Sequence, residues 1–183
     1  WQILILMATI SHLTRRLRQR RMRWTLQTTP LRLLVRLLSP LLLIYWCWGL
    51  VLVWLLFGWF GWPMVGSWAL IFLAQGLTAL ACLGMGALLY GLTRDGARAM
   101  SLAAGYSAPA FAFLGVTFPT ADMNGLAQCW RALLPASHYA ELQIGQASLG
   151  LLGRAAWMPV VALLMFMLVW PLVVWLLGRA GHD

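Results

Sequence analysis

The chain of 183 residues is 62% hydrophobic, has only 9% charged residues and has a mean hydropathy of +0.81. A soluble domain of this length needs far more polar surface, so the composition predicts an all-α bundle of membrane-spanning helices. The net charge of +9 comes from thirteen arginines and no lysine, against four acidic residues. Eight arginines lie in one block at residues 15–36, beside apolar segments. The positive-inside rule explains this block better than nucleic-acid binding, for which no readout fold is evident.

The chain opens with an apolar run at residues 1–11 that is too short to cross a membrane by itself. The basic residues follow this run, whereas in a secretory signal peptide they precede it. We therefore expect residues 1–11 to be the inner end of a truncated transmembrane helix, with part of that helix upstream of Trp1. Residues 12–40 then form a cytoplasmic basic segment.

The basic segment has two predicted helical parts. The first continues the entering helix. Thr29 and Pro30 then supply an N-cap and a proline at the first helical position, which predicts a second, short helix. Arg32 and Arg36 lie one turn apart on this helix and leucines occupy the rest, so we expect it to lie along the inner membrane surface. Anchoring to anionic lipids and docking of a cytoplasmic partner both fit this pattern.

Four apolar windows follow, and each lacks ionisable side chains other than tyrosine or cysteine. A helix rises roughly 1.5 Å per residue, so about 20 residues cross a hydrocarbon core of about 30 Å. The third window is short for this purpose and contains Pro109. The expected spans are residues 41–62, 68–92, 102–118 and 157–177, within a transmembrane domain at residues 41–178 that precedes a cytoplasmic tail at residues 179–183.

The arginines also predict the orientation of the spans. With residues 12–40 cytoplasmic, the cytoplasmic segments hold eleven arginines, and the outer segments hold Arg131 and Arg154. This is the asymmetry that the positive-inside rule describes for short loops. Three tryptophans near the turn between the first two spans would then anchor the outer interface: Trp59, Trp62 and Trp68.

A moderately polar insert at residues 119–153 separates the last two expected spans. Pro119 and Pro135 enclose a run whose apolar residues recur at helical spacing, which predicts a short amphipathic helix at the membrane surface. A second helical piece follows at residues 137–150, and we expect Gly145 to break it. The two pieces predict a re-entrant or surface hairpin that packs on the outer ends of the spans.

Two patterns within the spans bear on helix packing. Ala104, Ala108 and Ala112 recur every four residues and form a small-residue face that lets another helix approach closely. That helix belongs either to the same subunit or to a second subunit at a dimer seam. Gln75 is the only amide in any complete span, and it either bonds across helices or lines a path.

Several kinds of catalytic and binding site are missing. Without lysine the chain has no Walker A loop and no Schiff-base residue, so any ATP hydrolysis belongs to another chain. No span contains Asp, Glu, His or Arg, which argues against an ion-coupled carrier. His138 and Glu141 lack a nucleophile, so local hydrogen bonding is the simpler interpretation of this pair. Cys129 and His138 are too few ligands for a metal site, and three scattered cysteines define no disulfide framework.

The residues around the insert resemble a known family. The run APAFAFLGVTFP at residues 108–119, then Met123, Trp130, Pro135 and the His-Tyr pair at residues 138–139, is similar to the C-terminal half of type 2 ABC exporter permeases. In that family a phenylalanine-rich fifth helix ends in a Phe-Pro step, and a methionine-bearing connector leads towards the sixth helix. The resemblance extends over the whole chain in expected topology.

The resemblance implies a dimer of permease subunits, identical or different, with six spans each and two short re-entrant helices before the last span. It also implies cytoplasmic ATPase partners that carry ATP and magnesium, while this chain binds no cofactor. The coupling helix of the family corresponds to the region that contains Trp24, Thr25, Gln27, Leu31, Arg32, Leu34 and Arg36. The family often has a Gly-Thr-x-Glu stretch there, whereas this chain has Gln27 in place of the acid and no glycine before Thr25.

The resemblance makes the insert an outer gate, with Phe118, Pro119, Met123, Trp130, Pro135, His138 and Tyr139 as its expected residues. We therefore expect a permease subunit of the bacterial inner membrane that exports a hydrophobic or amphiphilic substrate, with the basic segment and the C-terminus cytoplasmic. Two alternatives share the composition. One is a membrane anchor or assembly subunit without transport, and the other is an intramembrane enzyme that acts on lipids through His138 and Glu141.

Overall fold

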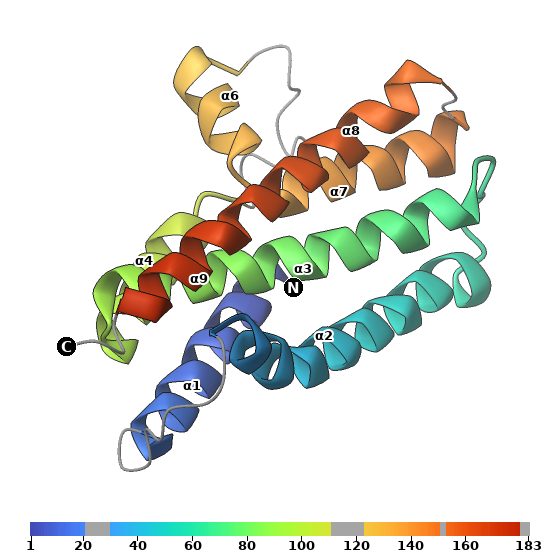
Figure 1. Ribbon diagram of the computed structural model, residues 1–183. Coiled ribbons are helices and arrows are strands. Elements are labelled where there is room, and N and C mark those ends of the chain that lie inside the picture. Colours follow the sequence, from blue (N-terminus) through green and yellow to red (C-terminus); the bar gives the residue numbers. More distant parts are fainter. Residues whose placement is uncertain (21–29, 111–122, 151–152, 180–183) are drawn as a thin grey trace.

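The computed structural model is an all-α bundle that describes residues 1–20, 30–110, 123–150 and 153–179 (Figure 1). Within these ranges, three helices are long and apolar enough to cross a membrane: Leu31–Trp59, Trp68–Thr93 and Arg154–Gly178. They overlap the expected spans at residues 41–62, 68–92 and 157–177, although the first helix begins about ten residues earlier than expected. The expected span at residues 102–118 extends beyond residue 110, so most of its second half lies outside the described residues.

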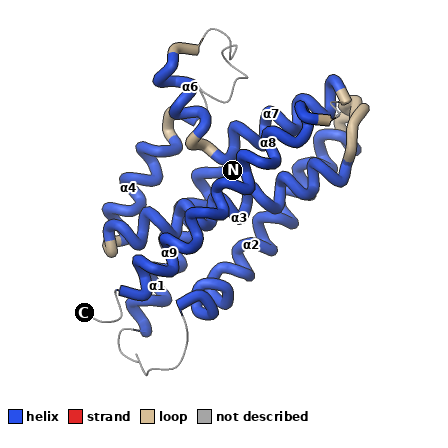
Figure 2. The backbone as a smooth tube through the Cα atoms, turned by 45° about the horizontal axis from the view of Figure 1, so that its top comes forward, coloured by secondary structure: helices blue, strands red, loops and turns tan. Residues whose placement is uncertain are grey.

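Helix α3 (Trp68–Thr93) forms the centre of the bundle (Figures 1 and 2). In its most apolar stretch 56% of the residues are buried, against 17% in each of the other two long helices. The helices that contact α3 are α1 (Gln2–Arg20), α2 (Pro30–Trp54), α4 (Gly96–Ser107), α7 (Pro135–Ile144), α8 (Arg154–Met165) and α9 (Val169–Arg179). The other helices are therefore positioned largely by their contacts with α3.

Helix α1 packs very closely on α3. Ile5, Leu6, Ile10 and Leu13 are fully buried along one face of α1. A Cβ atom at Gly86 of α3 would lie 3.0 Å from the Cβ of Thr9, so the glycine is what lets the two helices approach. The charged half of α1 keeps it out of the set of candidate spans, although the helix itself continues without a break to Arg20.

Helix α2 begins at Pro30, as the sequence predicts, but the expected separate helix at residues 31–38 is wrong. This part continues directly into the first span and ends in a π-helical turn at Leu55–Trp59. Pro40 lies inside α2, where its ring and its missing N–H group favour a bend. The first turns of α2 accordingly run in a different direction from the rest (Figures 1 and 2).

The leucine face of these first turns packs on protein, not along the membrane surface as expected. Leu34, Leu37 and Leu38 are buried in a cluster with Leu13 of α1 and with residues of α3 and α9. The basic end of α2 is therefore attached firmly to the bundle.

The predicted small-residue face of α4 is shifted in register. Ala99, Ala103 and Ser107 are the buried residues, and the two alanines pack on Leu6 and Ile10 of α1. Of the predicted set, Ala104 is only partly buried, Ala108 is exposed, and Ala112 lies outside the described residues. Within the subunit, close approach therefore uses the neighbouring alanine row.

Replacing Gly86 by alanine tests the close packing of α1 on α3. The new methyl group has no room beside Thr9, so we expect a loss of about 1–3 kcal/mol in unfolding free energy. The matched control is Gly105→Ala in α4, because no atom lies within 4 Å of a Cβ there. Replacing glycine by alanine at an open helical position raises the unfolding free energy by about 0.5–1 kcal/mol. Thermal unfolding in detergent should separate the two variants, and equal midpoints would contradict the packing.

Candidate functional site

The predicted hairpin is present as two helices, α6 (Gly125–Ala132) and α7 (Pro135–Ile144). Asn124 caps α6, because its Oδ1 accepts a hydrogen bond of 2.8 Å from the N–H of Ala127. Pro135 occupies the first turn of α7, where its missing N–H is no loss. Helix α6 projects away from the bundle (Figures 1 and 2), and its Leu126 side chain is 83% exposed.

The joint between α6 and α7 satisfies the carbonyl groups that a helix end leaves free. The Ser137 hydroxyl lies 2.5 Å from the carbonyl oxygen of Arg131 and 2.6 Å from that of Leu134. The Tyr106 hydroxyl of α4 donates to the carbonyl of Leu133. His138 contacts the carbonyl of Ala132, so each of the four carbonyls from Arg131 to Leu134 has a side-chain contact.

His138 and Glu141 each have a structural partner in this joint. His138 Nε2 lies 3.0 Å from the carbonyl oxygen of Ala132, and since a carbonyl only accepts, the ring proton is on Nε2. Glu141 Oε2 lies 2.8 Å from Nη2 of Arg131 at the end of α6. The two side chains hold the angle between the helices, in agreement with the local bonding expected from the sequence.

Helix α7 lies inside the bundle, against α3 and α8. The expected break at Gly145 is wrong: its φ of −60° and ψ of −40° are helical, and a π-helical turn at Gly145–Leu149 follows. The helical path ends at Gly150, whose φ of 55° suits glycine. Of the two boundary prolines, Pro135 marks a helix start and Pro119 lies outside the described residues, whereas Gly145 does not break the helix.

The far end of α7 is tied to the turn between α2 and α3 through Gln146. Its backbone carbonyl accepts from the N–H of Gly66 at 2.9 Å, and its side-chain Oε1 accepts from the N–H of Ser67 at 2.8 Å. Ser67 is the N-cap residue of α3 but makes no side-chain cap bond of its own. A Cβ at residue 66 would lie 2.2 Å from Gln146 Oε1, so this contact requires glycine.

The near end of α7 is tied to α1. Oε1 of Gln2 accepts a hydrogen bond of 3.1 Å from the N–H of Ala136, the second residue of α7. The rings of Trp1 and Tyr139 lie beside this bond, with their centroids 6.1 Å apart. The start of α7 therefore rests on the start of α1.

A cavity of about 560 Å³ lies next to this contact, between α1, α2, α3 and α7. Its polar lining includes Gln2, Gln75 and Gln143, and no charged side chain lines it within the described part of the chain. Gln75 both bonds across helices and lines the cavity: its Nε2 donates to the carbonyl of Trp46 at 3.2 Å. Gly49 makes room for this amide, because a Cβ there would lie 1.7 Å from Gln75 Nε2.

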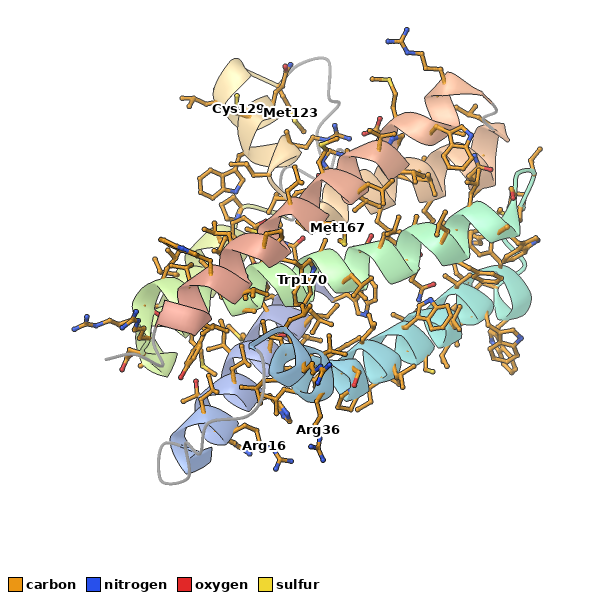
Figure 3. All side chains as sticks on the ribbon, viewed as in Figure 1. Arg16, Arg36, Met123, Cys129, Met167 and Trp170 are labelled. Atoms are coloured by element: carbon orange, nitrogen blue, oxygen red, sulfur yellow. The ribbon has the colours of Figure 1, made fainter. Side chains whose placement is uncertain are left out.

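Exposed arginines of α1 and α2 lie on the opposite side of the molecule from α6. Figure 3 shows Arg16 of α1 and Arg36 of α2 on this side, and Met123 and Cys129 on the other. Arg15 and Arg32 are exposed on the same two helices. On α1, burial and the charges of Arg16 and Arg15 lower the pKa of His12, which favours its neutral form.

The predicted coupling residues divide into three groups. Arg32, Arg36 and Leu31 are exposed, and Leu31 is 52% accessible. Leu34 is only 2% exposed and belongs to the packing cluster, so it holds the helix on the bundle, and its part in coupling stays a prediction. The remaining three, Trp24, Thr25 and Gln27, lie outside the described residues.

The structure describes five of the seven predicted gate residues. Met123 precedes α6, Trp130 is exposed on it, and the other three belong to α7: Pro135, His138 and Tyr139. Phe118 and Pro119 lie outside the described residues. Sequence reasoning missed the hydrogen-bonding side chains of this region, although isolated polar residues in apolar helices were a usable signal: Gln2, Tyr106, Ser137 and Gln146.

Replacing Ser137 by alanine tests the joint. The variant removes the hydroxyl donor from the carbonyls of Arg131 and Leu134, which keep only their backbone donors, so we expect a loss of about 0.5–1.5 kcal/mol in unfolding free energy. Ser101→Ala is the matched control, because Ser101 is exposed and only bonds back to Ala97 of its own helix. Thermal unfolding should show a clear loss for Ser137→Ala alone. A similar midpoint for both variants would contradict the role of the joint.

A family model described as ABC-2 family transporter protein matches residues 2–179. The match includes α1, the arginine-bearing turns of α2, the hairpin and the last long helix. Searches of curated proteins and of solved structures give no significant match.

Proposed function

The chain belongs to the ABC-2 family of transporter membrane proteins, and we propose that it is the permease subunit of an exporter driven by a separate ATPase subunit. As a member of this family it is a multi-pass membrane protein and not itself an enzyme. This removes the alternative of a lipid-modifying enzyme. It agrees with the positions of His138 and Glu141, whose polar atoms bond to Ala132 and Arg131 within the joint.

The observation that best supports an energised permease is the separation of two specialised regions by an uncharged interior. Exposed arginines of α1 and α2 lie on one side of the central helix α3, and Met123 and Cys129 of the hairpin region lie on the other (Figure 3). Between them, α3 contains no charged residue from Trp68 to Thr93. A chain without catalytic groups between these regions works by transmitting movement, which is the task of a permease that a partner drives.

The arginine-bearing side is the proposed docking surface for the ATPase. Arg32, Arg36 and Leu31 point outward, while Leu34 holds the same helix on α1, α3 and α9. Guanidinium groups form strong bidentate bonds with carboxylates, so the partner surface should be acidic. Residues 24–27 adjoin this surface in sequence and complete the proposed coupling region.

The hairpin is the proposed outer gate, and the proposed substrate is hydrophobic or amphiphilic. The cavity beside α7 has no charged lining in the described part of the chain, and α6 exposes Leu126 and Trp130. A charged substrate would pay a large desolvation cost in such surroundings, whereas an apolar one would not. ATP and Mg²⁺ belong to the partner in this proposal.

The proposal includes a second permease subunit, identical or different. The exposed part of the alanine row, Ala108 with the partly buried Ala104, fits a seam because small residues let helices approach closely. The orientation follows the arginines, with the basic segment and the C-terminus cytoplasmic and the hairpin outside, in a bacterial inner membrane.

Neutralising the two arginines of α2 tests two questions. It distinguishes a permease from a membrane anchor, and it distinguishes docking of an ATPase from anchoring to lipids. In Arg32→Gln/Arg36→Gln we expect co-purification with the ATPase and transport to fall by about tenfold, since two charge-assisted contacts are lost. The lysine pair at the same positions keeps the charge but not the bidentate geometry, and we expect partial activity. Full transport, or undiminished co-purification with the ATPase, in the glutamine variant would contradict docking.

Labelling of Cys129 tests the orientation. Cys129 is exposed on α6, Cys82 is fully buried, and Cys47 lies on the surface of the first span. In a background with Cys47→Ser and Cys82→Ser, a membrane-impermeant maleimide should modify Cys129 in intact cells. Modification only after lysis would invert the proposed topology, and Cys129→Ser supplies the blank.

A further inference from the structure

We propose that Gln2 is a positioning residue through which α1 holds the start of α7, so that α1 links the basic segment to the hairpin. The hydrogen bond between Gln2 and the start of α7 is a contact in the structure. The role of Gln2 in transport rests on the proposed function. Gln2 belongs neither to the predicted coupling residues nor to the predicted gate residues.

The start of α7 needs a partner for its backbone from outside the helix. The first N–H groups of a helix have no intrahelical acceptor, and Leu134 at the N-cap position has no polar side chain to supply one. Oε1 of Gln2 fills this role for Ala136 at 3.1 Å, across 134 residues of sequence. Gln2 is only 6% exposed, so loss of the bond removes the protein acceptor from a largely buried N–H group.

Helix α1 is suited to carry a displacement along its axis. It is one uninterrupted helix from Gln2 to Arg20, and its buried face is held on α3 at Ile5, Ile10 and Leu13. At the basic end, Leu13 belongs to the same cluster as Leu34 of α2. A push on the arginine-bearing turns of α2 therefore reaches α1 through apolar packing and reaches α7 through Gln2.

The other end of α7 is held by a different partner. Gln146 binds the backbone of Gly66 and Ser67, in the turn that joins α2 to α3. A movement of α1 thus acts on one end of α7 while the other end stays attached to this turn. The expected response is a tilt of α7 about the Gln146 contact, and not a shift of the whole hairpin.

Gln2→Leu removes the acceptor at similar side-chain volume, and Gln143→Leu is the matched control on α7 beside the same cavity. Hydrogen exchange of the peptide that contains Ala136 is the direct readout, measured on the assembled transporter in nanodiscs. We expect exchange to rise by about tenfold in Gln2→Leu, as one net hydrogen bond predicts, and to stay unchanged in Gln143→Leu. Gln2→Glu keeps an acceptor oxygen and should restore protection.

Transport assays on the same samples test the link. Gln2→Leu should retain ATP hydrolysis within about twofold while transport falls by at least about fivefold, since the hairpin no longer follows α1. Unchanged exchange at Ala136 overturns the positioning role whatever the chain transports. Raised exchange with full transport overturns the link between α1 and the gate. If the unmodified protein binds no ATPase, the proposed function fails, while the exchange result still decides the role of Gln2.

Discussion

Inside an apolar bundle, every backbone group at the end of a helix must find a partner within the protein, and the arrangement of this chain depends on that requirement. Helix α7 begins and ends among other helices, so both of its ends raise the problem. Gln2 supplies the partner at one end, and Gln146 joins the other end to the start of α3. The same need explains why Ser137 and Tyr106 converge on the carbonyls of the α6–α7 joint. Polar side chains are scarce in this chain, and those near the hairpin serve its backbone.

This requirement also separates polar side chains that stabilise the fold from polar side chains that are free to bind a partner. His138 and Glu141 resemble an acid/base pair in sequence, yet their polar atoms are engaged by the joint. The exposed arginines have no comparable structural task in the described turns, because burial of Leu34 and its neighbours already attaches that end of α2. The proposed docking surface therefore consists of side chains that the fold does not need. This difference between bonded side chains in the joint and exposed arginines on α2 agrees with membership of a transporter family.

Much of the fold follows from local sequence, because hydropathy and proline act over short distances. Three long apolar helices and the start of α2 at Pro30 were predicted in this way, whereas the second piece of the insert was expected from residue 137 and α7 begins at Pro135. Features that depend on neighbours were not: Pro40 lies within a continuous helix, and Gly145 stays helical. The alanine row that packs in α4 and the burial of Leu34 depend on which helix is adjacent, and one sequence does not encode that choice visibly.

The rigid joint between α6 and α7 has a geometric consequence. Helix α6 stands clear of the bundle, and the ion pair of Arg131 with Glu141 and the bonds of Ser137 and His138 fix its angle to α7. Such an L-shaped body has a buried arm of ten residues, α7, and a projecting arm of eight residues, α6. A rotation of α7 within the bundle therefore carries the projecting arm, with Leu126, along with it. A displacement delivered inside the bundle thus becomes a movement outside it.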